Sequence, residues 1–192
     1  MAIKIKGATF LHIPKTGGTW LSYYFRQSGM VLAESELAHI SGAKMSAIDK
    51  NEVVFCIVRH PLTWLRSWWQ CKQKIVKDRR GVPIDKIVDH EFNKFVDLFI
   101  KDCPTFINSF FSSYTEYCHF ICKQESLRED LEALFKYAKI NYDKKKLLSM
   151  ENVNVIPSIE KYTIEQALKI MEIASGMAKL HGYNYIPLDI IK

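Results

Sequence analysis

The sequence predicts an α/β protein in which helices flank a mostly parallel central sheet, in three layers. Two apolar runs support this prediction, residues 8–13 and Val53–Val58, because their composition is typical of buried strands. Each run is followed by a short loop and then by a segment that we expect to be helical. The whole chain, residues 1–192, is expected to form a single domain, because this length suits one core.

The other elements follow along the chain. Helices are predicted over five segments: 20–27, 62–76, 84–101, 127–138 and 163–180. Further strands are predicted at 117–122 and, shorter, within 147–156, whereas 104–116 shows no clear pattern. Gly29 is expected to end the first helix, and Pro61 to open the second. Thr163 and Gln166 form a capping-box pattern at the start of the last helix.

The charge of the chain favours an anionic partner. The formal net charge is +6 and the isoelectric point is about 9.0, so a nucleic acid, an anionic membrane surface and a small polyphosphate all fit. The basic residues are scattered among acidic ones, and the densest run, residues 144–146, is expected to be a solvated face. Nucleic acid is therefore not expected as a partner, and no pattern indicates an oligomeric state.

The lack of a recognisable targeting signal and the number of cysteines predict a cytoplasmic protein. No segment has the pattern of a signal peptide, and no apolar run reaches the roughly 18 residues of a transmembrane helix. The five cysteines are odd in number, which favours reduced thiols. Cys118 and Cys122 have no matching second pair, so no metal site is expected.

The segment between the first strand and the first helix reads HIPKTGGTW and suits a bound phosphate or sulfate. Gly17 and Gly18 let the backbone approach an anion, and the following helix directs its N–H groups there. Lys15 adds a charge, and Thr16 and Thr19 add hydroxyl donors. A glycine turn with an exposed lysine is the simpler alternative. A Walker A loop is excluded, because Lys15 precedes both glycines instead of following them.

A second candidate motif begins where the second strand ends. Arg59 follows that strand, and Ser67 lies eight residues later, about two turns into the helix. An arginine fork and a hydroxyl can together hold a phosphate. Ligands of α/β sheets bind beyond the carboxyl ends of the strands, so Lys15 and Arg59 are expected to face one crevice. Taken singly, Arg59 would be read as a surface ion-pair residue and Ser67 as an ordinary helix residue.

The two motifs, in this order, resemble those of the sulfotransferase superfamily, which has a P-loop NTPase-like fold and uses 3′-phosphoadenosine 5′-phosphosulfate (PAPS). The resemblance implies that Lys15 contacts the phosphosulfate and assists departure of the 5′-phosphate. It also implies that the loop amides of Gly17 and Gly18, together with Thr19, hold that phosphate. Trp20 takes the position of a tryptophan that can lie against the adenine.

The same resemblance implies that Arg59 and Ser67 hold the 3′-phosphate. Members of the family often have Arg-Asn-Pro or Arg-Asp-Pro where this chain has Arg-His60-Pro. The chain lacks the Arg-Lys-Gly loop of the cytosolic members and is more similar to the Golgi-type and microbial ones. Lys161 and Arg128 are the residues that could replace that loop.

The implied reaction moves the sulfuryl group of PAPS to a hydroxyl or amine acceptor, a small molecule or a carbohydrate, and requires no metal. A hydroxyl acceptor needs a general base. We expect His39 to be this base, because it lies between the two motifs, where many family members keep one. The other candidates are His12, His60, Glu34 and Glu36, and Glu36 is favoured if the acceptor is an amine.

Two other functions fit parts of the sequence. A nucleoside or nucleotide kinase would require ATP and Mg²⁺, but the lysine precedes the glycines and no clear Mg²⁺-binding carboxylate is visible. A non-catalytic module that binds PAPS or another anion would not need Lys15. The sequence does not identify the acceptor.

Overall fold

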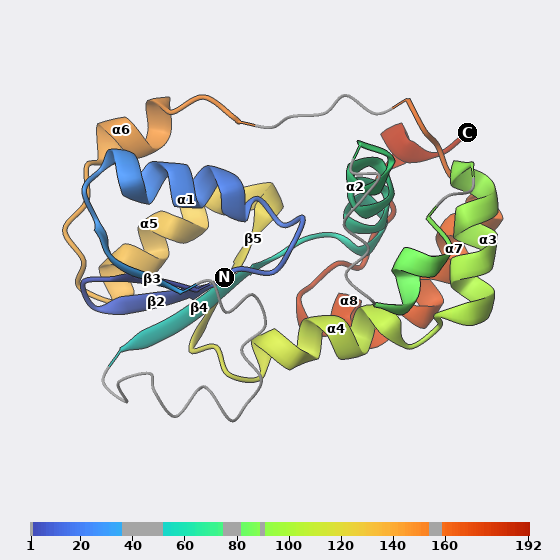
Figure 1. Ribbon diagram of the computed structural model, residues 1–192, viewed down its shortest axis with the longest axis horizontal. Coiled ribbons are helices and arrows are strands. Elements are labelled where there is room, and N and C mark those ends of the chain that lie inside the picture. The colour runs from blue at the N-terminus through green and yellow to red at the C-terminus, as the bar shows by residue number, and fades with distance from the viewer. Residues whose placement is uncertain (1, 36–51, 75–81, 89–90, 154–158) are drawn as a thin grey trace. The chain divides into compact units, whose positions relative to one another are not determined.

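The computed structural model describes residues 2–35, 52–74, 82–88, 91–153 and 159–192. The chain divides into two compact units (Figure 1). The first unit comprises Met1–Arg59 and Ser113–Ile156, and the second comprises His60–Ser112 and Pro157–Lys192. The first unit holds the sheet, and the second is mainly helical.

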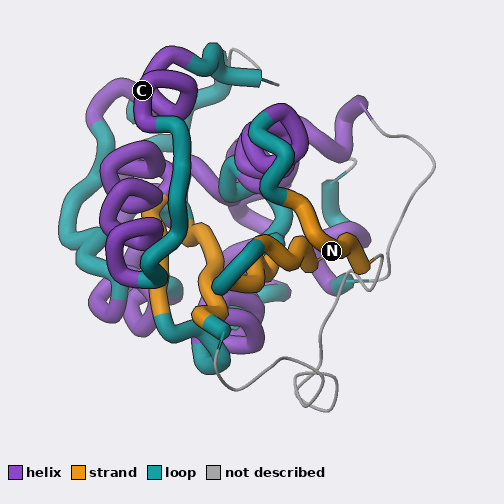
Figure 2. The backbone as a smooth tube through the Cα atoms, turned by 90° about the vertical axis from the view of Figure 1, so that its left-hand side faces the viewer, coloured by secondary structure: helices purple, strands orange, loops and turns teal. Residues whose placement is uncertain are grey.

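A five-stranded sheet forms the centre of the first unit, with the strand order β3-β1-β2-β4-β5. Its strands, shown in orange in Figure 2, are β1 (Ala2–Ile5), β2 (Ala8–Leu11), β3 (Val31–Ser35), β4 (Val53–Val58) and β5 (Phe120–Lys123). Strands β2, β4 and β5 are parallel to one another. Strand β1 is antiparallel to both of its neighbours, β2 and β3. The protein is therefore α/β, as predicted, but its sheet is mixed.

The prediction of a mostly parallel sheet was wrong because it missed β1 and β3. Ile3 and Ile5 are fully buried on either side of the exposed Lys4, which is the alternation of a strand with one buried face. Four residues interrupted by lysine are too short to show this pattern in the sequence. Gly7, at φ 86°, lies in the tight turn that folds β1 back against β2 as a hairpin.

Helices α1 (Gly18–Gln27) and α5 (Leu127–Tyr137) pack against the same face of the sheet. The Tyr24 and Phe135 rings stack with centroids 6.3 Å apart, which joins the two helices. The Phe10 and Phe55 rings of adjacent strands, 5.2 Å apart, lie beneath them in the same core. These helices confirm the prediction that helices flank the sheet, whereas the three-layer arrangement stays a prediction.

Helix α6 (Lys144–Ser149) covers the first three residues of 147–156, where a short strand was predicted, and the last three residues of that segment lie outside the described residues. The Asp143 side chain accepts a hydrogen bond of 2.9 Å from the backbone N–H of Lys146 and so caps the helix. Leu147 is fully buried and packs into the core of the first unit. One turn of helix with a single buried residue leaves little periodicity to detect.

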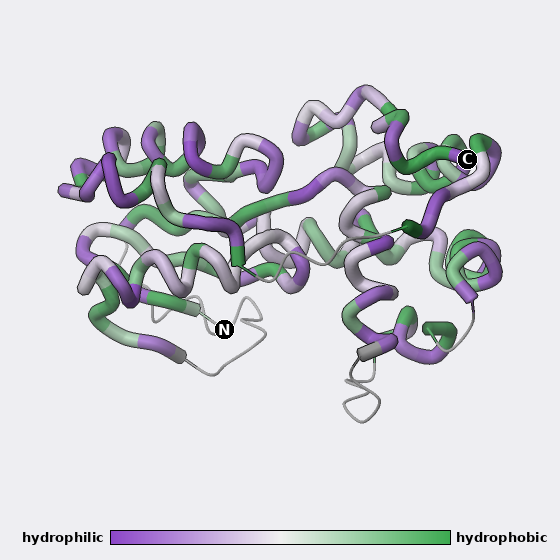
Figure 3. Tube along the Cα trace, turned by 90° about the horizontal axis from the view of Figure 1, so that it is seen from above, coloured by the Kyte–Doolittle hydropathy of each residue, from purple (hydrophilic) through white to green (hydrophobic). Residues whose placement is uncertain are grey.

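The second unit contains helices α2 (Pro61–Lys74), α3 (Phe92–Asp102), α7 (Ile164–Ile173) and α8 (Ser175–Leu180), two short 3₁₀ turns, η2 (Pro83–Lys86) and η4 (Leu188–Ile190), and the start of α4 (Phe106–Thr115). Hydropathy changes along these helices, as expected of amphipathic segments (Figure 3). The core of this unit is rich in aromatic residues: the centroid of the buried Trp64 ring lies 5.3 Å from that of Phe111 and 5.2 Å from that of Trp68. None of the helices among the described residues is both long and apolar enough to cross a membrane.

Three helix boundaries differ from the predicted ones. The predicted helix over 84–101 is a 3₁₀ turn followed by α3, and 104–116 is mostly the helix α4. The last predicted helix begins with the expected capping box of Thr163 and Gln166. It is interrupted at Ala174, whose ψ of 10° ends α7 and begins α8.

Candidate functional site

The loop between β2 and α1 holds two residues in the left-handed backbone region. Lys15 has φ 68° and Gly17 has φ 94°. Glycine adopts this conformation freely, whereas a side chain with a β-carbon pays about 1–2 kcal/mol for it. Strain of this kind is typical of functional loops, because the surrounding structure must enforce it. Lys15 is therefore held in a conformation that it would not adopt by itself.

The start of α1 has no side-chain cap. Gly17 occupies the cap position without a capping hydrogen bond, and the first turn contains no acidic residue. The first N–H groups of a helix have no partner within the helix, and they carry the positive end of its dipole. Thr19 is exposed in this first turn. This combination of N–H groups, dipole and the nearby Lys15 is suited to binding an anion.

Thr16 differs from its predicted role as a hydroxyl donor to the ligand. Its side chain is fully buried, and its hydroxyl donates a hydrogen bond of 2.8 Å to the carbonyl of Ile13. The hydroxyl therefore stabilises the turn. Only the backbone N–H of Thr16 is left to contribute to an anion.

The ring of His12 leaves no room for a side chain at position 18, so this residue must be glycine. A β-carbon at Gly18 would lie 2.1 Å from His12 Cδ2 and 2.3 Å from Nε2. The imidazole stacks on Phe10 with ring centroids 5.7 Å apart, so it is held in place from the strand side. Burial, with a contribution from the charge of Lys15, lowers the pKa of His12 to about 4. The ring is therefore neutral at pH 7, and packs against the loop.

Arg59 forms a direct hydrogen bond to the glycine loop between β2 and α1. Its Nη1 donates a hydrogen bond of 3.1 Å to the carbonyl oxygen of Lys15. Strands β2 and β4 are parallel neighbours in register, so their carboxyl ends meet at one edge of the sheet. The structure thus brings together Lys15 and Arg59, which are separated by 44 residues in the sequence.

The junction of β5 and α5 forms another side of the loop, which the sequence did not predict. A β-carbon at Gly17 would lie 3.3 Å from Gln124 Cγ and 3.6 Å from Leu127 Cδ2. The carboxyl ends of β2, β4 and β5 therefore converge around the glycine loop. The available signal was the predicted strand at 117–122, whose end places Gln124 at this edge.

Trp20 lies mainly in the core. It is 6% exposed, and its indole N–H donates 2.9 Å to the carbonyl of Glu151. The guanidinium of Arg128 lies over the indole, 5.2 Å from the ring centroid, and also donates 2.7 Å to the carbonyl of Met150. So little of the ring is exposed that packing is the role this geometry favours over contact with an adenine.

The structure does not test the predicted places of Ser67 and His39 beside the loop. Ser67 lies half-buried in α2 of the second unit, so its pairing with Arg59 stays a prediction. His39 lies outside the described residues, as does Glu36. Their predicted roles as the general base stay predictions too.

The remaining base candidates are occupied by other contacts. His60 is fully buried in the second unit; its Nδ1 accepts 3.3 Å from the N–H of Leu62, and its Nε2 lies 2.9 Å from the carbonyl of Tyr185. Its ring thus caps α2, the role that asparagine or aspartate often has at the start of a helix. Glu34 accepts two hydrogen bonds from Arg26, of 2.8 and 2.7 Å, which lower the pKa of its carboxyl.

Across the described ranges, no group of three or more His, Cys, Asp and Glu side chains lies close enough to hold a metal ion. No protein-family model matches the chain, and neither a curated protein nor a solved structure matches it.

Proposed function

We propose that this protein is a PAPS-dependent sulfotransferase with a P-loop NTPase-like sulfotransferase fold. The observation that carries the proposal is the hydrogen bond between Arg59 and the strained Lys15, at the uncapped start of α1. It joins the two sequence motifs that resemble the sulfotransferase superfamily. The five cysteines are free thiols, which fits a cytoplasmic location.

The residues of the loop fit the anionic part of PAPS. The N–H groups of Gly17, Gly18 and Thr19 and the ammonium of Lys15 would hold the 5′-phosphosulfate. Arg59, with Ser67, would hold the 3′-phosphate, since a guanidinium can donate two hydrogen bonds to one phosphate. The overall charge of +6 favours the approach of such an anion.

In the proposed reaction an oxygen or nitrogen of the acceptor bonds to the sulfur while the bond from sulfur to the 5′-phosphate oxygen breaks. The acceptor's proton passes to a base, for which His39 remains our candidate, and adenosine 3′,5′-bisphosphate leaves. Such a transfer is expected to have a loose transition state, as phosphoryl transfer does, so catalysis comes from positioning and charge stabilisation. Lys15 would stabilise the charge that develops on the departing phosphate.

The alternatives make different predictions. A nucleotide kinase would require ATP and Mg²⁺, and the order of Lys15 and the glycines argues against it. A non-catalytic module would bind PAPS without turnover.

The test compares Lys15→Ala with Lys6→Ala, a control at an exposed lysine before the Gly7 turn. Each variant is supplied with ³⁵S-labelled PAPS and a panel of carbohydrate, phenol and amine acceptors. We expect Lys15→Ala to lower the transfer rate by about 10²–10³-fold, as loss of one charge-stabilising donor typically does. Its affinity for adenosine 3′,5′-bisphosphate should fall far less. If both variants transfer label equally well, the role of Lys15 is wrong, and if the parent protein transfers none to any acceptor, the non-catalytic alternative is favoured.

A further inference from the structure

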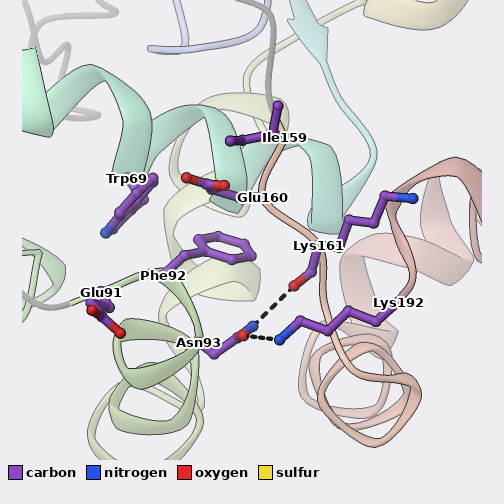
Figure 4. Close-up of a pocket in the computed structure, with 8 residues that line it drawn as sticks. All are labelled: Trp69, Glu91, Phe92, Asn93, Ile159, Glu160, Lys161 and Lys192. Carbon is purple, nitrogen blue, oxygen red and sulfur yellow. Dashed lines mark hydrogen bonds between the residues drawn. The ribbon is translucent and has the colours of Figure 1, made fainter.

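The second unit contains a cavity of about 500 Å³ that the proposed sulfotransferase chemistry does not use. This volume lies within the range of small-molecule sites in proteins. Figure 4 shows the residues that line it: Trp69, Glu91, Phe92, Asn93, Ile159, Glu160, Lys161 and Lys192. They come from α2, from the start of α3, and from two segments near the carboxyl end of the chain.

Two aromatic rings form one wall of this cavity. Trp69 on α2 and Phe92 at the start of α3 meet edge to face, with centroids 5.3 Å apart. Phe92 is almost fully buried, whereas Trp69 is partly exposed and so presents indole surface. The face of an indole carries negative charge density and attracts organic cations.

Two carboxylates lie beside these rings. In Figure 4 the Glu160 carboxylate lies near Trp69 and Phe92, and Glu91 lies next to Phe92 at the start of α3. Glu91 occupies the cap position of α3, yet its side chain makes no capping hydrogen bond. Within the described part of the chain, neither carboxylate has an ion-pair partner.

The basic groups of the cavity are directed elsewhere. The ammonium of Lys192 donates a hydrogen bond to Oδ1 of Asn93. The Lys161 side chain points away from the rings, and its backbone carbonyl accepts 3.0 Å from Nδ2 of Asn93. Arg66 approaches Glu160 through the backbone, donating 3.2 Å to its carbonyl oxygen. The aromatic end of the cavity therefore has two acidic side chains, with the Arg66 guanidinium beside the backbone of Glu160, while the two lysines are at the other end.

The walls of the cavity are also held in place. The Tyr162 hydroxyl donates 2.7 Å to the carbonyl of Leu62, which fixes the segment after Glu160 along α2. Asn93 donates 3.0 Å to Gln166, and Gln166 donates 2.7 Å to Asp97, which ties α3 to α7. A site formed in advance loses little conformational entropy when a ligand binds.

We infer that this cavity binds an organic ammonium cation, with the ammonium against the Trp69 ring and beside Glu91 and Glu160. A neutral ligand such as a sugar would gain the ring contact but no electrostatic attraction from the two carboxylates. The site lies wholly within the second unit, and the inference does not depend on the proposed sulfotransferase activity.

The test is a titration of the ¹⁵N-labelled full chain with choline, followed by the indole N–H signal of Trp69. That signal is assigned as the one that disappears in the Trp69→Phe variant. The uncharged analogue of choline, 3,3-dimethylbutan-1-ol, is titrated in parallel at equal ionic strength. We expect choline to shift the signal saturably and to bind at least about tenfold more tightly than the alcohol. Glu160→Gln should weaken choline binding by about tenfold, whereas the exposed control Glu172→Gln should leave it unchanged.

Three results would each overturn the inference. The first is an unchanged Trp69 signal at every choline concentration. The second is equal binding of choline and the alcohol by the parent protein, which would make the cavity a site for neutral ligands. The third is choline binding that Glu160→Gln leaves unchanged. The affinities of the two ligands can be compared on the parent protein alone from whichever indole N–H signal moves, so this comparison holds even if a variant fails to fold.

Discussion

Nη1 of Arg59 donates a hydrogen bond of 3.1 Å to the carbonyl oxygen of Lys15 and so fixes a charged group from β4 against the glycine loop that follows β2. The carbonyl that accepts this bond belongs to the residue whose backbone is strained, at φ 68°. Arg59 therefore has two expected roles: it stabilises the loop and carries positive charge to the anion site.

Arg59→Lys should weaken the binding of adenosine 3′,5′-bisphosphate by about 10–100-fold, because an ammonium cannot reproduce the guanidinium fork. Isothermal titration calorimetry of the variant and the parent measures this change. The matched control is Arg26→Lys, an exposed arginine that pairs with Glu34 in the same unit. Equal affinities of Arg59→Lys and the parent would remove Arg59 from the site.

Gly18→Ala should lower the free energy of unfolding by about 1–3 kcal/mol, because the new methyl group would collide with the stacked ring of His12. If this collision is the cause, His12→Ala should suppress most of the cost of the alanine at position 18. A double-mutant cycle by urea denaturation measures the coupling between the two sites. Additive effects of the two substitutions would show that the collision with His12 is not the cause.

The low pKa of His12 makes stability depend on pH. Its imidazole takes up a proton below pH 6.5 in the unfolded chain but only near pH 4 in the folded protein. The unfolded state therefore binds more protons between these values, and the free energy of unfolding falls as the pH is lowered from 6.5 to 4. The contribution of this residue is about 3 kcal/mol over that interval.

The measurement for His12 is the difference in unfolding free energy between the parent and His12→Gln at several pH values. The free energy of unfolding of the parent minus that of His12→Gln should decrease as the pH falls from 6.5 to 4, because only the parent has a histidine at position 12. A difference that stays constant over the interval would contradict the lowered pKa.

His60→Asn should destabilise the second unit less than His60→Leu, by about 1 kcal/mol. Asparagine can still accept a hydrogen bond from the N–H of Leu62 at the start of α2, whereas leucine leaves that buried donor without its partner. Both substitutions lose the contact with the carbonyl of Tyr185, so their comparison isolates the cap. Thermal unfolding of the two variants side by side checks the order, and equal melting temperatures would exclude the capping role.

The sequence predicted those parts of the fold that have a local signal. Val53–Val58 and the capping box at Thr163 are strong signals, since a continuous β-branched run and a paired cap each require only neighbouring residues. Strand β1 was missed because its four residues are too few to show the alternation of the buried Ile3 and Ile5, although its antiparallel partner β2 follows after one tight turn. The same limit applies to α6, whose one buried residue is set by its contact with the core.

In the candidate site, too, some features follow from neighbouring residues, whereas others depend on residues that are distant in the sequence. The residue types of the glycine loop identified Lys15 and Gly17, and both adopt the left-handed conformation that shapes the loop. The burial of Trp20 was not visible in the sequence, because its contacts with Glu151 and Arg128 come from residues more than 100 positions later. Contacts at this separation follow from how the first unit folds.

The proposed nucleotide site is best tested by calorimetric titration of the parent protein with adenosine 3′,5′-bisphosphate, with ADP, and with ATP plus Mg²⁺, alongside thermal unfolding. We expect selective binding of the bisphosphate, and at about 100 times its Kd the free energy of unfolding should rise by about 2.7 kcal/mol. Stabilisation by ATP with Mg²⁺ alone would contradict the sulfotransferase proposal and favour the kinase. A protein that binds none of the three nucleotides would contradict the assignment of the glycine loop as a nucleotide site.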